Sequence, residues 1–259
     1  MICSQRLTEE MQNASDVPGV HSVCRKIAIS LGFEYFIYGV RIPVSLTQPY
    51  HFCLSGYPRA WRERYDSMGY LKIDPLVSHA FASSLPLIWD EVKRDGELVK
   101  CFFNEAGSHG LLHGISAPVY GRRGDIAMLS LAGSIPISAD LDRRNELRTR
   151  AHWFASVLHD AIRRVVLTSD GAPVVTDNLS EREKDCLMWV ADGRTSAQIA
   201  SRLKISERTV LFHIENAGVK LGVNGRHNIV ARAIALGEIE LSRHALRAVE
   251  LPATHESLH

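Results

Sequence analysis

Hydrophobic residues recur with two different periods along the chain, and each period predicts one kind of element. Runs rich in aromatic and β-branched residues, typical of strands, occupy four short segments, at 35–42, 50–54, 116–120 and 126–132. The last two are joined across residues 121–124, where Gly121 and Gly124 suit a hairpin turn. A sheet is therefore expected in the first part of the chain.

Helical signals surround these strands. Pro58 suits a first helical turn and Gly69 a helix end, which together predict a helix over 58–68. Apolar residues at helical spacing from Leu141 to Val165 predict a long amphipathic helix that ends near Leu167. The mixture of strands and helices indicates an α+β domain.

From Leu179 onward every signal is helical. Ser180 with Glu183, and Thr195 with Gln198, each fit a capping box that starts a helix, and Ser206 caps a third. The apolar face of the first of these helices is expected at Cys186, Leu187, Val190 and Ala191, and Gly193 ends it. The buried positions of the third are expected at Val210, Ile214, Ala217 and Leu221. A fourth amphipathic helix is expected over 228–236.

Four short helices with a tight turn between the second and third allow the third to enter a DNA major groove. Its outward residues can bind phosphate or touch base edges: Arg208, Thr209, Leu211, His213 and Lys220. Thr195, Ser206 and Asn216 complete the candidate DNA-binding set. The alternative from pattern alone is a small helical interaction module, since basic helix faces are usually just solvated.

Turn-forming and helix-breaking residues between Thr168 and Pro173 indicate a linker. The predicted organisation is an N-terminal domain over 1–168, a linker over 169–178, an all-α four-helix domain over 179–241 and a tail over 242–259. A length of 259 residues suits two domains that each bury a core.

Composition and charge narrow the classes of protein. The net charge is only +1, but residues 194–232 hold seven bases and two acids, 7 − 2 = +5, which suits a phosphate-facing segment. Five scattered cysteines without a C-x-x-C pair suggest neither disulfides nor zinc, so no metal or cofactor is expected. No apolar run approaches the roughly 20 residues that span a bilayer, and no secretory signal is evident. A cytoplasmic protein without a membrane partner is expected.

Several residues of the N-terminal domain have plain structural interpretations. Tyr57, Trp61 and Tyr65 share one face of a predicted helix, a stripe more often core than ligand site. Asp74 precedes Pro75 as a helix cap does, Trp89 suits a buried aromatic position and Gly114 a turn. None of these alone requires a ligand.

The segment from Leu179 to Val223 closely resembles the helix-turn-helix of LuxR-type regulators. Glu183, Leu187 and Gly193 stand where that motif has its Glu, Leu and Gly. Thr209-Val210 and Phe212-His213 match its recognition helix. Leu211 departs from a common Lys or Asn, and residues 225–228 replace a commoner R-x-Q run. The first difference bears on base preference, and the second on phosphate contacts or on the pairing of terminal helices.

The segment from Gly56 to Glu91 resembles the autoinducer-binding domain of the same family, which implies an antiparallel sheet sandwiched by helices in an α-β-α arrangement. The resemblance implies contacts to an N-acyl-homoserine lactone. Trp61 donates to the lactone carbonyl, Asp74 accepts the amide N–H, and Tyr57 and Ser130 donate to the acyl carbonyl. The lactone ring and the start of the chain are walled by Tyr65, Trp89, Phe102, Ala106 and Leu111. Leu76 replaces a residue that is polar in one relative, which bears on whether a 3-oxo group fits.

The resemblance implies a quorum-sensing regulator that binds near-palindromic promoter DNA as a homodimer, and RNA polymerase if it activates. The final helix and the long helix before the linker are the expected pairing surfaces. One alternative is an orphan regulator that responds to a non-lactone molecule or is active without ligand. A distant one is a lactone-modifying enzyme, but the sequence contains no H-x-H-x-D, H-E-x-x-H or G-x-S-x-G arrangement. We therefore expect no catalysis.

Overall fold

The computed structural model describes residues 2–42, 49–121, 124–166 and 179–239. Contacts divide the chain into two compact units, 1–175 and 176–259. The predicted linker at 169–178 and tail at 242–259 lie outside the described residues, and the predicted domain limits remain predictions.

The first unit is built on one five-stranded antiparallel sheet. Its strands are β1 (Tyr35–Ile42), β2 (Tyr50–Ser55), β3 (Leu87–Ile88), β4 (His113–Tyr120) and β5 (Ile126–Gly133). Their order across the sheet is β2-β1-β5-β4-β3. The pattern located β1 at its observed bounds, whereas β4 begins three residues before the predicted strand. Of the predicted 121–124 turn, Gly121 and Gly124 are described and residues 122–123 lie outside the described part.

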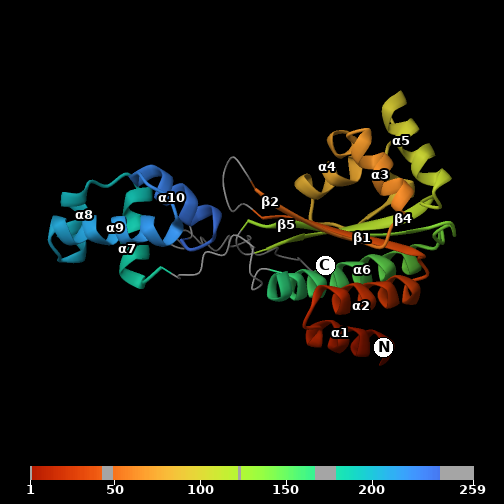
Figure 1. Cartoon of the computed structure of the whole chain (residues 1–259), viewed down its shortest axis with the longest axis horizontal. Helices are drawn as coiled ribbons and strands as arrows, with labels where there is room; N and C mark the ends of the chain where they lie inside the picture. Colours follow the sequence, from red (N-terminus) through yellow and green to blue (C-terminus); the bar gives the residue numbers. More distant parts are fainter. Residues whose placement is uncertain (1, 43–48, 122–123, 167–178, 240–259) are drawn as a thin grey trace, which may run out of the picture. The chain divides into compact units, whose positions relative to one another are not determined.

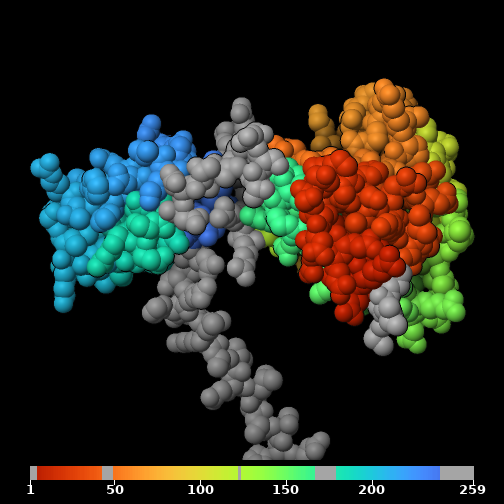
Figure 2. Space-filling model, turned by 60° about the horizontal axis from the view of Figure 1, so that its bottom comes forward, coloured from red at the N-terminus to blue at the C-terminus, as the bar shows by residue number. Residues whose placement is uncertain are grey.

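Helices cover both faces of this sheet (Figure 1). One layer holds α1 (Ile2–Asn13), α2 (Val17–Ser30) and α6 (Leu141–Val166). The other holds α3 (Arg59–Ser67), α4 (Pro75–Ala82) and α5 (Glu97–Ser108), with short 3-10 turns η1 (Tyr70–Lys72) and η2 (Trp89–Glu91). Figure 2 shows α1 and α2, in red, over one side of this unit. The expected α-β-α arrangement is confirmed.

Alternation along β1 divides its side chains between the two layers. Phe36, Tyr38, Val40 and Ile42 are buried in the core formed with α2 and α6. Their neighbours Ile37, Gly39 and Arg41 therefore face the α3–α5 layer. That second face carries the candidate site.

Gly114 on β4 is required by close packing rather than by a turn. A Cβ added there would lie 2.6 Å from the carbonyl oxygen of Leu131 and 2.7 Å from the indole ring of Trp89. The absence of a side chain thus lets Trp89 lie flat against the sheet. The prediction of a turn at Gly114 is wrong, because the residue lies inside a strand.

The described part of the second unit, residues 179–239, contains four helices, as predicted: α7 (Glu181–Ala191), α8 (Ser196–Leu203), α9 (Glu207–Leu221) and α10 (Arg226–Ala235). Both predicted capping boxes are present, and the Ser206 side chain accepts from the N–H of Thr209. The four predicted core positions of α9 are buried. Ala191 was expected on the buried face of α7 but is exposed. The helix predicted over 228–236 begins two residues earlier.

The turn between α8 and α9 depends on a residue that pattern analysis did not single out. Lys204 adopts a left-handed conformation with φ of 56°, which is uncommon for a residue with a side chain. Its N–H donates to the carbonyl of Ala200, which closes α8 and lets Ser206, two residues later, cap α9.

Candidate ligand cavity and DNA-binding helices

A cavity of about 610 Å³ lies between the sheet and the α3–α5 layer. This volume is in the range of small-molecule sites, which is roughly 300–1,000 Å³. All ten residues predicted to contact a ligand line it: Tyr57, Trp61, Tyr65, Asp74, Leu76, Trp89, Phe102, Ala106, Leu111 and Ser130. The structure thus brings the whole predicted set together, from five segments of the chain.

Aromatic rings form one wall of the cavity. The Trp61 ring lies 5.9 Å from those of Tyr65 and Tyr70 and 5.8 Å from that of Phe102, measured between centroids. Trp61 and Phe102 are each only 3% exposed. Of the predicted stripe, Trp61 and Tyr65 lie on α3 and Tyr57 precedes it. Trp61 is buried, Tyr57 and Tyr65 pack partly buried against the same cluster, and all three line the cavity.

Two hydrogen-bond donors at this wall have no protein partner. The Tyr57 hydroxyl is buried and unpaired. Within the described part of the chain, no hydrogen bond of the Trp61 indole N–H is found either. Burial raises the pKa of Tyr57, so its hydroxyl keeps its proton. A buried donor without an acceptor, such as the Tyr57 hydroxyl, is costly, and ligand oxygens in the cavity would satisfy both this hydroxyl and the Trp61 N–H.

Asp74 supplies the acceptor. One carboxylate oxygen accepts from the N–H of Leu76 at 2.8 Å and so caps α4, while the other accepts from the Tyr65 hydroxyl at 2.9 Å. Burial raises the pKa of Asp74 from 3.8 to about 6, although these hydrogen bonds oppose the shift. The side chain is therefore both the predicted helix cap and a poorly solvated acceptor at the cavity.

A short hydrogen-bond chain leads from Trp89 to Ser130. The indole N–H donates to Ser116 Oγ at 2.9 Å, and Ser116 Oγ lies 2.8 Å from Ser130 Oγ. Because Ser116 Oγ already accepts from Trp89, its own O–H can donate a hydrogen bond to Ser130 Oγ. The Ser130 hydroxyl hydrogen is then free to donate into the cavity. Ser116, which sequence reasoning missed, orients the predicted ligand contact.

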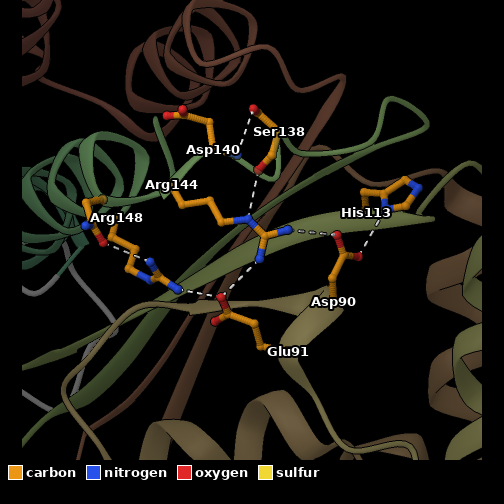
Figure 3. Close-up of polar contacts among 8 residues, drawn as sticks. Asp90, Glu91, His113, Ser138, Asp140, Arg144 and Arg148 are labelled. Carbon is orange, nitrogen blue, oxygen red and sulfur yellow. Dashed lines mark hydrogen bonds and ion pairs between the residues drawn. The ribbon is translucent and has the colours of Figure 1, made fainter. Parts of the chain in front are cut away.

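The outer side of the η2 turn is tied to α6 by an ion-pair network (Figure 3). Glu91 accepts from Arg144 at 3.2 Å and from Arg148 at 2.5 Å. Asp90 lies 3.1 Å from His113 Nδ1 and 3.9 Å from Arg144. The segment that carries Trp89 is therefore held between the cavity and α6.

In the second unit, most of the predicted DNA-contacting residues lie at the N-terminal half of α9. Arg208 and Leu211 are exposed, and Thr209, His213 and Asn216 are half-buried. Ser206 and Thr195 are the N-caps of α9 and α8, and both residues are exposed to solvent. The roles of these residues at DNA remain predictions.

Lys220 does not lie free on the outward face. Its ammonium donates to Glu183 at 2.9 Å, and the same carboxylate oxygen accepts from the N–H of Ser180 in the capping box. Glu183 is 4% exposed, so Lys220 neutralises a buried charge and joins α9 to the start of α7. Lys220 therefore has a structural ion pair within the unit, and its role at DNA remains a prediction.

Comparison with known families gives a consistent result. Residues 16–162 match the family described as autoinducer binding domain, and residues 177–233 match that described as bacterial regulatory proteins, luxR family. The chain belongs to the LuxR family.

Relatives of this LuxR-family protein have names that state their role. It is 35% identical to the transcriptional activator protein AnoR of Acinetobacter nosocomialis, over 83% of this chain and 90% of the relative. It is 34% identical to the quorum-sensing regulator RhlR of Pseudomonas aeruginosa, over 90% and 95%. These relatives are transcriptional regulators and not enzymes, so the chain is a quorum-sensing regulator with a helix-turn-helix domain.

A solved structure of SdiA in complex with octanoyl-rac-glycerol is similar to this LuxR-family chain. The TM-score is 0.74 at 27% identity, over 90% of this chain and 93% of that one. The match confirms the fold of both units.

Residues that the motif-based reasoning missed lie at the edge of the cavity. Arg41, His51, Cys53 and Arg62 all line it. The period-2 pattern of β1 contained the signal for Arg41, since the buried residues alternate with Ile37, Gly39 and Arg41.

In the described residues no group of three potential metal ligands is found. Nor is any helix of these ranges long and apolar enough to span a membrane.

Proposed function

We propose that this LuxR-family regulator binds an N-acyl-homoserine lactone in the cavity and binds near-palindromic promoter DNA as a homodimer. The observation that carries the proposal is the match between the polar groups that line the cavity and those of the ligand. In the described residues the Tyr57 hydroxyl and the Trp61 indole N–H are donors without acceptors, and Asp74 is a buried carboxylate that already accepts from Leu76 and Tyr65 and can accept one more donor.

An acyl-homoserine lactone has the complementary set. Its lactone carbonyl accepts from Trp61, its amide N–H donates to Asp74, and its acyl carbonyl accepts from Tyr57 and Ser130. Indole can only donate and an ionised carboxylate can only accept, so the polarity of each contact is fixed. The acyl chain contributes roughly 0.8 kcal/mol for each buried methylene.

Ligand binding stabilises the folded first unit, and so controls how the second unit reaches DNA. A ligand that binds only the folded state adds roughly 2.7 kcal/mol at a concentration a hundred times its Kd. Two α9 helices related by a two-fold axis would meet successive major grooves about 34 Å apart. Contacts to RNA polymerase then follow if the regulator activates, and the site of action is the cytoplasm.

A second candidate ligand is a non-lactone amphiphile such as an acylglycerol. The similar structure of SdiA holds octanoyl-rac-glycerol, which has an acyl carbonyl but no amide N–H. Such a ligand would have to donate to Asp74 through a glycerol hydroxyl instead of an amide N–H, so the comparison of the two ligand classes tests which donor the carboxylate accepts.

The test compares a series of acyl-homoserine lactones with acylglycerols of equal chain length by calorimetry. The full chain and its Trp61→Phe and Asp74→Ala variants are titrated, with Asp142→Ala, an exposed acid on α6 that does not line the cavity, as the control. Removing a partner costs on the order of 1 to 3 kcal/mol, which is about 5- to 150-fold in Kd. Equal affinity of all four proteins for every lactone would overturn the pocket assignment.

A further inference from the structure

The cavity has a second polar end, far from the groups that would hold a lactone. Arg41 and His51 both line the cavity. They lie directly opposite each other in the register of β1 and β2. Because β1 alternates, Arg41 is on the same sheet face as Ile37 and Gly39, toward the α3–α5 layer.

The sheet register gives the separation of the two ends. Ser130 pairs with Ile37, and Ile126 pairs with Arg41, four residues further along β5. At a rise of about 3.3 Å per residue the two ends are about 13 Å apart. An extended hydrocarbon chain advances about 1.25 Å per carbon, so about ten carbons reach from the Ser130 end to Arg41.

The path between the ends is open along the sheet. Gly39 lies midway, and a Cβ built on it would meet no atom within 4 Å. Its partner across β1 and β5, Met128, lines the same cavity. A chain can therefore run over Gly39 toward Arg41.

The far end lacks an acceptor for its cation. In the described ranges no hydrogen bond or ion pair of Arg41 or His51 is found, whereas Arg64 donates to Glu105 at 2.7 Å and Arg62 to Cys53 at 2.8 Å. Of the two described acids that line the cavity, Asp74 accepts from Leu76 and Tyr65, and Asp66 is exposed on α3, four residues after Arg62. A guanidinium holds a carboxylate through two parallel hydrogen bonds.

We propose that the ligand's acyl chain spans about ten carbons and ends in a carboxylate, which Arg41 binds with help from His51. The inference rests on the proposed function for the lactone end of the cavity. It adds a distal site that discriminates between an oxidised and a methyl-terminated chain.

The experiment uses two lactones with the same ten-carbon acyl chain, one ending in a methyl group and one in a carboxylate. Their Kd values are measured by calorimetry for the full chain, for Arg41→Leu and for Arg25→Leu. Arg25 is an exposed arginine on α2 that does not line the cavity. We expect the parent and Arg25→Leu to bind the carboxylated lactone about tenfold tighter or more. We expect Arg41→Leu to reverse that order.

Three outcomes would overturn the inference while leaving the proposed function intact: a preference for the methyl end, an unchanged ratio in Arg41→Leu, and equal Kd values for the two lactones. If both lactones bind but the parent prefers the methyl end, or if Arg41→Leu keeps the parent's ratio, the distal site does not exist. If neither lactone binds, the proposed function fails and the distal site falls with it. A chain end that reaches solvent past Arg41 would give equal Kd values for the two lactones, which also refutes the proposal.

Discussion

Replacing Asp74 by Asn separates the stability of the ligand-free protein from its affinity for ligand. Asn caps a helix about as well as Asp, so the bond from the Leu76 N–H is kept. The substitution removes a carboxylate that is only 6% exposed. We expect the ligand-free protein to become more stable and the lactone to bind more weakly.

The magnitude follows from the pKa of the carboxyl. Burial raises it from 3.8 to about 6, and each pH unit corresponds to about 1.36 kcal/mol. Holding Asp74 ionised therefore costs the folded state on the order of 3 kcal/mol above pH 6. Below pH 3.8 both folded and unfolded states are protonated and the cost vanishes. Between these limits the folded state binds the proton more readily, so the unfolding free energy falls as pH rises.

The assay is thermal unfolding of the full chain without ligand at pH 7.5 and pH 5, for the parent and for Asp74→Asn. One kcal/mol shifts the midpoint by about 2–4 °C in a unit of this size, so the variant should gain about 6–12 °C at pH 7.5 and about half of that at pH 5. Asp66→Asn, an exposed acid of the same cavity, should change little. A variant that is less stable than the parent at pH 7.5, or whose gain is equal at both values, would refute the argument.

Three further predictions test other parts of the molecule. Lactone affinity of the parent should fall as pH drops below about 6, because a protonated Asp74 is a weaker acceptor for the amide N–H than the carboxylate; a flat Kd from pH 7.5 to 5, measured by calorimetry, would contradict this. Gly114→Ala should lower the unfolding free energy by about 1–3 kcal/mol, because its Cβ would meet the Leu131 carbonyl and the Trp89 ring, and urea unfolding measures the loss. Lys220→Met should lower the unfolding free energy of the second unit by about 1–3 kcal/mol, measured by urea unfolding, because Glu183 is left buried without its cation. An unchanged unfolding free energy would contradict this prediction.

Local signals predicted the elements well where one short segment decides the structure. The strand at Tyr35–Ile42 and the capping boxes of α7 and α8 depend on residues within a few positions of each other. The prediction of a turn at Gly114 was wrong because glycine is needed there to make room for the Trp89 ring. Trp89 is 25 residues away along the chain, so no local pattern could show this contact.

Only those residues of the candidate site that belong to a recognisable family motif could be predicted from the sequence. Ten predicted residues line one cavity, but the pattern gave no sign that Ser116 orients Ser130, since the two serines meet through strand register. Lys220 was placed outward by helical spacing, yet its flexible side chain reaches Glu183 on α7. Arg41 was overlooked because an arginine in a strand is usually solvated, and only the register places it at the cavity.

The central claim is that a small amphiphile behind Trp61 and Asp74 changes how two copies of α9 bind DNA. The most direct measurement is fluorescence anisotropy on a near-palindromic duplex selected from random DNA by the liganded protein, with and without a saturating lactone whose binding calorimetry has established. The account predicts different Kd values for DNA in the two conditions, and no difference for an Asp74→Ala variant at the same lactone concentration. Identical DNA-binding curves for the parent with and without bound lactone would contradict it.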